Sequence, residues 1–215
     1  MAQQNGTKLA KVFAIIIGVT AILVMIGWFF DIGFFKSVSP SWVTMKFQTA
    51  VAFLLSAIIL YFISEDFEGR TAVAGIVLPL ASFIIATFML SLLTSAFLGI
   101  RTGLEDLFVI EAGGTVKTAV PGRPSVPTLV NFILVATSGV VTVFHPAHLK
   151  SILSWLGGMI AMIGAVAFVG YLLDVPQLYY SIAGVNTAMA FQTAILFVLF
   201  GVGLLLLARQ KGKMI

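Results

Sequence analysis

The chain has 215 residues, of which 60% are hydrophobic and only 9% are charged, and its mean hydropathy is +1.13. A soluble domain carries about 25% charged residues, so this composition excludes a soluble globular protein and predicts an integral membrane protein in a lipid bilayer. The absence of cysteine excludes disulfides and thiolate metal sites, and the net charge of +4, with basic residues in both tails, suits anionic lipid headgroups rather than nucleic acid.

Six hydrophobic stretches are long enough, at about 20 residues per crossing, to predict transmembrane helices. They cover residues 12–30, 46–63, 72–99, 127–144, 149–173 and 187–208. The first is longer than the apolar segment of a secretory signal and has no small-residue cleavage site, so we expect it to be retained. Pro79 predicts a kink in the third. The predicted fold class is an all-α, polytopic membrane protein with six helices.

An even number of helices places both termini on one side of the membrane. That side carries seven basic residues and the other carries five, namely Lys8, Lys11, Arg70, Lys150, Arg209, Lys211 and Lys213 against Lys36, Lys46, Arg101, Lys117 and Arg123. This bias, with three basic residues directly after the last helix, predicts a plasma-membrane protein with both termini in the cytoplasm.

Three long connections lie on the opposite, outer side, at residues 31–45, 100–126 and 174–186. Each combines aromatic and acidic residues, which makes it too polar to cross lipid and too aromatic for a plain linker. We therefore expect these loops to contain short amphipathic segments that lie at the membrane interface.

The sequence contains an internal repeat. MKFQTAVAFLL at 45–55 returns 144 residues later as MAFQTAILFVL at 189–199, with seven of eleven positions identical, and GWFFDI at 27–32 corresponds to GYLLDV at 170–175. A weaker third copy lies between them and matches Gly99, Gly103, Thr128 and Phe132 to Gly27, Asp31, Thr49 and Phe53. The repeat predicts one transmembrane domain, residues 1–215, made of three helical hairpins at 12–63, 72–144 and 149–208.

Polar side chains fall at matching points near the outer entrance of the second helix of each hairpin. They are Gln48, Thr49, Thr128, Gln192 and Thr193. Around a pseudo-threefold axis these side chains would approach one centre, where they could line a small ligand site. The alternative is that they only tie helices together or cap helix N-termini.

The outer loops supply a second group of candidate ligand-binding residues. They are Asp31, Glu105, Asp106, Asp174 and Tyr179. Clustered carboxylates near the outer interface could attract a cation or a proton, or hold a polar ligand. The alternative is that each acid caps the interfacial segment that follows it.

The remaining sequence motifs give weaker indications of a functional site. His145 and His148 have i, i+3 spacing but no third ligand nearby, so we expect a solvated turn and no metal site. Gly157, Gly158 and Gly164 predict close helix packing, either inside the bundle or in a homo-oligomer. The sequence has no nucleophile motif, phosphate-binding loop or dinucleotide fingerprint, so we expect neither an enzyme nor a cofactor.

Several stretches occur in a characteristic order and spacing over nearly the whole chain. They are GWFFDI at 27–32, WVTMK at 42–46, TAVAFLL at 49–55, GLEDLF at 103–108, PGRP at 121–124 and GYLLDVPQLY at 170–179, followed by Met189 and Thr193-Ala194. Together they resemble the multi-helix membrane sensor region at the N-terminus of many bacterial and archaeal histidine kinases and diguanylate cyclases. The resemblance implies a sensing or coupling function.

The chain departs from that family in two places. Where the family usually has Pro-Asn or a His before Thr-Ala, this chain has Phe47-Gln48 and Phe191-Gln192, so a histidine-dependent role is not carried over. The family's last helix leads into a cytoplasmic PAS, kinase or cyclase unit, whereas this chain ends at Ile215. The resemblance therefore implies a sensor module without its own output domain.

From these observations we expect a stand-alone sensor-like or accessory membrane module that binds a small ligand, lipid or partner at its outer face. It would pass the change through its last helix to a separate membrane protein or kinase. Two other classes stay open, a small transporter or channel and a structural subunit of a larger membrane complex. The six predicted helices carry no charged residue well inside them, which disfavours an ion pathway.

Overall fold

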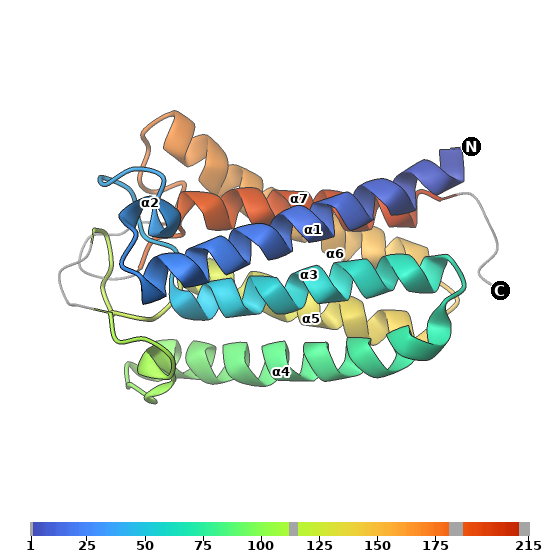
Figure 1. Cartoon of the computed structure of the whole chain (residues 1–215), viewed down its shortest axis with the longest axis horizontal. Helices are drawn as coiled ribbons and strands as arrows, with labels where there is room; N and C mark the ends of the chain where they lie inside the picture. The colour runs from blue at the N-terminus through green and yellow to red at the C-terminus, as the bar shows by residue number, and fades with distance from the viewer. Residues whose placement is uncertain (1, 112–115, 181–186, 211–215) are drawn as a thin grey trace.

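The computed structural model describes residues 2–111, 116–180 and 187–210, and all regular secondary structure in these ranges is helical (Figure 1). The elements are α1 (Ala2–Phe29), α2 (Gly33–Lys36), α3 (Phe47–Phe67), α4 (Thr71–Leu98), η1 (Leu104–Asp106), α5 (Val126–Phe144), α6 (Leu149–Leu172) and α7 (Phe191–Ala208). Within the described ranges, six of these helices are long and apolar enough to cross a membrane. The prediction of an all-α, multi-pass membrane protein is confirmed.

Helix boundaries differ from the predicted ones mainly near the two ends of the chain. α1 begins at Ala2 rather than at residue 12, because the preceding residues include good helix formers that extend the helix beyond its apolar part. α7 begins at Phe191 rather than at 187, because the residues before it are extended; the Met189 N–H donates to Tyr179 O at 3.0 Å. α4 runs as one helix through Pro79.

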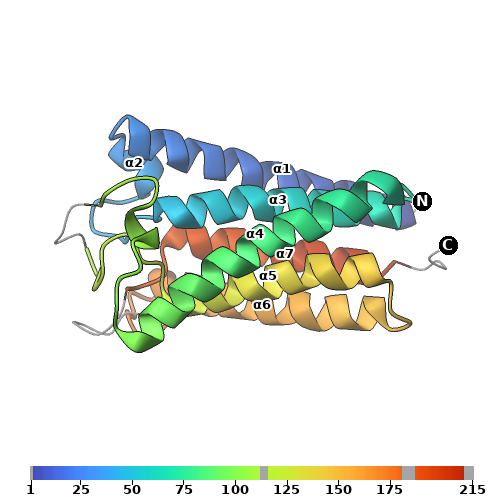
Figure 2. The same ribbon diagram turned by 90° about the horizontal axis from the view of Figure 1, so that it is seen from below.

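The six long helices run side by side along the long axis of the molecule (Figures 1 and 2), and three of them are more buried than the others. In the apolar windows of α3, α5 and α7, 67%, 50% and 50% of the residues are buried, against 28%, 33% and 33% for α1, α4 and α6. Each outer helix packs against two inner ones: α1 against α3 and α7, α4 against α5 and α3, and α6 against α7 and α5. The outer helices thus fill the grooves between the inner helices.

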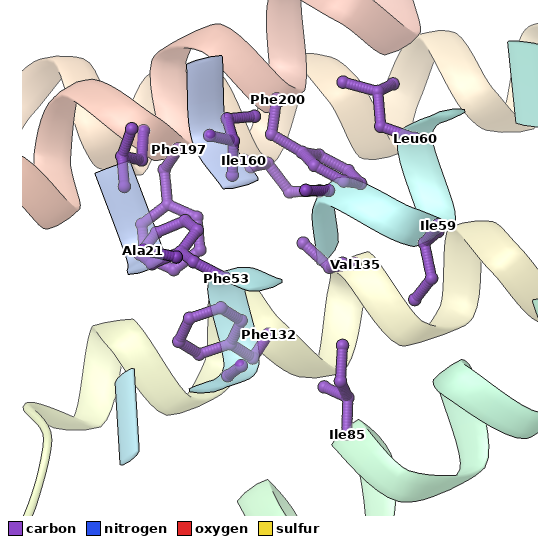
Figure 3. Close-up of a cluster of buried hydrophobic side chains, with 14 of the residues drawn as sticks. Ala21, Phe53, Ile59, Leu60, Ile85, Phe132, Val135, Ile160, Phe197 and Phe200 are labelled. Carbon is purple, nitrogen blue, oxygen red and sulfur yellow. The ribbon is translucent and has the colours of Figure 1, made fainter. Parts of the chain in front are cut away.

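Aromatic rings fill the centre of the bundle (Figure 3). Phe53 of α3, Phe132 of α5 and Phe197 of α7 are fully buried, and their ring centroids are 4.7, 4.8 and 4.9 Å apart in the three possible pairs. Aromatic pairs at such distances contribute about 0.5–1.5 kcal/mol each beyond the area they bury. The three rings join the inner helices and close the middle of the bundle.

Glycines allow α6 and α7 to approach closely. A Cβ added at Gly157 would lie 2.7 Å from Gly201 O, and one added at Gly164 would lie 2.7 Å from Ala194 O. Any larger residue at these two positions would push the helices apart. Gly158, in contrast, faces no atom within 4 Å. Gly157 and Gly164 therefore serve packing inside the bundle.

The connections divide the molecule into two ends. The long connections α1–α3, α4–α5 and α6–α7 lie at one end, here called the long-loop end (Figure 1). The short turns at 68–70 and 145–148 lie at the other, the short-loop end, together with the start of α1 and the end of α7. The chain thus enters and leaves the bundle at the same end. The one-turn helices α2 and η1 lie within the first two long connections.

Candidate functional site

Asp31 and Asp174 terminate the helices that precede them. Both have a left-handed backbone, with φ of 54° and 51°, and the N–H of the next residue donates to the carbonyl of Gly27 or Gly170 at 2.9 and 2.8 Å. This bond is typical of a Schellman helix end, whose left-handed position usually holds Gly or Asn. For the first loop, the alternative that the acid caps the following segment is wrong, because the N-cap of α2 is Ile32 and has no side-chain cap bond.

Gly99 forms the corresponding helix end in the second hairpin. It has φ of 67°, and the Ile100 N–H donates to Ser95 O at 3.2 Å. Gly99, rather than Gly103, therefore occupies the position of Asp31. At this helix end the predicted match is displaced by four residues. Matching glycines alone was misleading, because both of these glycines have positive φ and only the hydrogen bond distinguishes them.

Three of the four predicted loop acids lie apart from one another at the surface. The Asp31 side chain is 92% exposed and pairs with Lys36 at 2.5 Å, and this hydrogen bond lowers the pKa of the carboxyl. Asp174 is exposed, and Asp106 pairs with Arg101 at 2.6 Å. The structure therefore does not bring these three carboxylates into one cation site.

Glu105, the fourth acid, is buried in a polar network under the second long loop. One carboxylate oxygen accepts from Ser95 Oγ at 2.6 Å and from Arg123 Nη2 at 3.0 Å, and the other accepts from Thr102 N and Oγ1 at 3.1 and 3.2 Å. Burial raises the pKa of Glu105, but these hydrogen bonds outweigh burial and lower the pKa to about 2. The charged carboxylate thus anchors the loop through donors of the chain itself.

A second buried ion pair joins Lys46 to Glu111. Nζ lies 2.5 Å from Oε1, and the two side chains are 3% and 2% exposed. Lys46 Nζ also donates to Thr118 Oγ1 at 2.8 Å, while Glu111 Oε2 accepts from Gly122 N at 2.6 Å. Burial lowers the pKa of Lys46, and Glu111 opposes that shift. Because Lys46 directly precedes α3, the pair ties the second long loop to the start of the most buried helix.

Neither Lys46 nor Glu111 was predicted as a site residue, and Arg123 was not either. The sequence did contain one signal for them, a lysine at the entrance of an apolar run, which requires a partner when it is buried. The identity of that partner was not predictable, because Glu111 lies 65 residues further along the chain.

Gln48 and Gln192 each contact the loop of a neighbouring hairpin. Gln48 Nε2 donates to Glu105 O, and Gln192 Nε2 donates to Phe35 O over 3.4 Å. In the first case α3 contacts the loop that follows α4, and in the second α7 contacts the loop that follows α1. The two amides therefore make the same kind of contact at matched positions.

Thr49, Thr128 and Thr193 occupy the third position of α3, α5 and α7, and each is 2% exposed. The hydroxyls of Thr128 and Ser125 share a hydrogen bond at 2.7 Å, and Ser125 Oγ accepts from Thr128 N at 3.3 Å, as expected of an N-cap. Each threonine lies four residues before one of the three central phenylalanines. The threonines thus share one level, a helical turn from the aromatic centre.

Trp28 and Tyr171 make equivalent contacts in the first and third hairpins. Trp28 Nε1 donates to Met45 O, and the Tyr171 hydroxyl donates to Met189 O, both at 2.8 Å. Each bond closes a long loop by joining the end of the helix before the loop to the residue two positions before the helix that follows it. The sequence repeat predicted the matched positions but not this hydrogen bond.

Tyr179, the predicted aromatic site residue, is a packing residue of the third loop. It is 1% exposed, and its ring stacks on Tyr171 with centroids 4.1 Å apart. Lys117 donates a hydrogen bond to the Tyr179 hydroxyl, and its ammonium lies 4.8 Å from the centre of the ring. Tyr179 therefore joins the third loop both to α6 and to the second loop.

One cleft borders these groups, and a second lies at the opposite end of the bundle. At the long-loop end, the cleft between Trp28, Gln48 and Glu111 is too narrow to admit a water molecule. At the short-loop end, a cleft of about 310 Å³ lies between the end of α3 and the start of α4, beside Glu65 and Arg70. Within the described ranges, no three His, Cys, Asp or Glu side chains come close enough to hold a metal ion.

Comparison with known proteins adds no assignment to this geometry. No protein-family model matches the chain, and neither does a curated protein or a solved structure.

Proposed function

We propose that the chain is one transmembrane domain of three repeated hairpins, at residues 12–63, 72–144 and 149–208, arranged about a common centre. The order of helix packing supports this most directly. Each outer helix contacts the inner helix of its own hairpin and the inner helix of the hairpin before it, with α1 closing the circle on α7. The three central rings and the matched contacts of Gln48 and Gln192 follow the same circular order.

We further propose that the protein is a stand-alone sensor-like or accessory membrane module. Its long-loop end would engage a small ligand, a lipid or a partner, and a change there would reach a separate protein at the short-loop end. The observation that carries this proposal is the buried Lys46–Glu111 pair, because it joins a long loop to the residue directly before α3. A displacement of the loop would therefore act directly on a helix at the centre of the bundle.

Polar contacts also hold α3 at its far end, which supports transmission along it. Lys11 of α1 pairs with Glu65 at 2.5 Å, and His145 bonds Asp66 at 2.8 Å. A rigid helix with ion pairs at both ends can bias contacts at one end when the other end moves. In the proposed orientation the short-loop end and both termini face the cytoplasm, where the partner membrane protein or kinase would bind.

Hydrogen–deuterium exchange tests this coupling without a known ligand. Glu111→Gln breaks the buried pair, and it is expected to increase amide exchange both in the second long loop and at residues 64–71 at the far end of α3. Asp106→Asn changes a surface ion pair of the same loop and serves as the control, for which exchange at 64–71 should not change. Faster exchange of the loop alone would contradict the proposal.

A photo-crosslinking amino acid at the exposed Arg70 position tests the output. In native membranes it is expected to capture one repeatable partner, and Glu111→Gln is expected to change the yield of that product. A yield that does not change in Glu111→Gln would favour a structural subunit. Such a subunit should copurify stoichiometrically with its complex whether or not the Lys46–Glu111 pair is intact.

A small transporter is the second candidate, because two of the buried side-chain oxygens without a hydrogen-bond partner among the described residues lie in the middle of long helices. They are Asn131 Oδ1 of α5 and Ser82 Oγ of α4. A polar atom without a hydrogen-bond partner inside a membrane bundle destabilises the fold, and solute pathways are often lined by such atoms. We expect purified protein in liposomes to produce no proton or potassium flux above protein-free vesicles, since aromatic rings close the centre. A flux that Asn131→Leu abolishes would favour transport.

A further inference from the structure

The short-loop end holds two sets of charged contacts around the end of α3. In the first set, Lys11 of α1 pairs with Glu65 and Glu68 at 2.5 and 2.7 Å, and Arg70 pairs with the same two acids at 2.9 and 3.1 Å. Two cations thus face two carboxylates. The second set consists of Asp66 and His145.

Asp66 and His145 join the end of α3 to the end of α5. The Asp66 side chain is 5% exposed, and its Oδ2 lies 2.8 Å from His145 Nε2. His145 is the left-handed residue (φ 44°) that terminates α5, and its Nδ1 lies 3.1 Å from Val143 O. Both ring nitrogens therefore face an oxygen.

The two oxygens determine which protonation state of the His145 imidazole can make both contacts. An ionised carboxylate and a backbone carbonyl can only accept hydrogen bonds, whereas a neutral imidazole carries a single N–H. Both contacts form only if the pair holds one more proton than a neutral His145 beside an ionised Asp66. The negative end of the α5 helix dipole also favours a positive charge at this position.

We propose that Asp66 and His145 form a proton-dependent clasp between α3 and α5 at the short-loop end of the bundle. With the proton bound, both ring nitrogens donate and the two helix ends are joined. When the proton is lost, one ring nitrogen presents a lone pair to an oxygen, and that contact opens. This clasp does not depend on the long loops or on a ligand there, so it can be tested separately from the proposed function.

The neighbouring acids of α3 and its turn are held in ion pairs of their own, which do not involve His145. Glu65 and Glu68 from α3 and its turn face Lys11 and Arg70. Burial raises the pKa of Glu68, but hydrogen bonds from Lys11 and Thr7 outweigh it and lower the pKa.

On the α5–α6 side, Lys150 donates to Gln210 O at 2.9 Å, and His148 is exposed in the same turn as His145. Histidine is the side chain whose charge ordinarily changes between about pH 5 and 8. The His145 side chain is itself 39% exposed, so His148 offers a matched control: it is a histidine in the same turn whose ring makes no hydrogen bond among the described residues.

The sign of the pH effect follows from the extra proton. A proton held in the folded protein stabilises it at low pH, and this stabilisation is lost as the pH rises. The thermal midpoint in lipid nanodiscs is expected to fall between about pH 5.5 and about pH 8, on either side of the range in which histidine titrates. His145→Gln should reduce this fall to a small fraction of that of the wild type, and His148→Gln should leave it unchanged.

Nitrogen-15 NMR of the wild-type imidazoles keeps the test independent of how the variants fold. His145 should show two protonated ring nitrogens, or one short proton shared with Asp66, at about pH 5.5, and one protonated nitrogen at about pH 8. A neutral, unshared His145 at the lower pH would overturn the proposal. So would a His145→Gln protein whose midpoint still falls as much as that of the wild type.

Discussion

Lys46 and Glu111 are charge partners in a nearly dry site, so the removal of one leaves the other without compensation. Glu111→Gln is expected to lower the free energy of unfolding by about 3–5 kcal/mol. The double variant Lys46→Met with Glu111→Leu should recover most of that loss, because it removes both charges together. Reversible unfolding in detergent micelles measures the difference. Single and double variants of equal stability would show that the two charges are not coupled.

Glu105 predicts how the protein responds to acid. Its folded pKa of about 2 lies below the ordinary value of 4.5, so its contribution is complete above pH 4.5 and is lost as the pH falls from about 4.5 to about 2. Glu105→Gln should be less stable at neutral pH and should lose this part of the acid dependence. Asp106→Asn, which alters a surface pair, should keep it. An unchanged acid slope in Glu105→Gln would assign the effect to another group.

The sequence made individual polar residues conspicuous but did not predict what each of them contacts. Gln48, Thr49 and Glu105 were recognised because a repeat and an apolar background make polar side chains conspicuous. The role of Asp31 was missed because it follows from the backbone, whose left-handed conformation ends α1. The partner of Lys46 was missed because it is supplied by a loop that folds back over the helix, and no local pattern encodes that contact.

The α6–α7 pair offers two neighbouring glycines with opposite surroundings. Gly157→Ala would place a Cβ 2.7 Å from Gly201 O, so we expect it to lower the free energy of unfolding by about 1–3 kcal/mol through overpacking. Gly158→Ala meets open space and should be neutral or stabilising by up to about 1 kcal/mol, because alanine favours helix. Chemical unfolding of the two variants compares them directly. Equal effects would mean that the helices do not approach at Gly157.

The helices themselves were predictable because a membrane imposes both their length and their composition. Apolar runs of about 20 residues had to be helices, since lipid leaves no other way to satisfy the backbone of a single segment. Their ends were less predictable, since contacts with loops set them. Residues before Phe191 are apolar enough to continue α7, yet they stay extended because the Met189 N–H bonds Tyr179 O.

For the molecule as a whole, the repeat in the sequence makes a more specific prediction than hydrophobicity does. Hydrophobicity gives six helices in any arrangement, whereas matched hairpins require a particular order of contacts around a centre. In the described part of the chain, α1, α4 and α6 each pack against two inner helices, which is compatible with the proposed order. In the second copy, only the end of the first helix was matched with an error of four residues, because its loop keeps only glycine and leucine in common with the other two; the match of Thr128 and Phe132 to Thr49 and Phe53 agrees with their positions in α5 and α3.

Cysteine cross-linking tests the common centre most directly, because the chain has no cysteine of its own. Cysteines would replace two of the three central phenylalanines at a time, in the pairs 53/132, 53/197 and 132/197. The control pair is Phe53 with Phe83, a residue of α4 whose side chain is exposed on the outside of the bundle. We predict that a short bifunctional thiol reagent joins all three central pairs within one chain, as measured by intact mass, and does not join the control pair. Three hairpins around one centre would be contradicted if only one or two central pairs were joined, or if the central pairs were joined no more than the control pair.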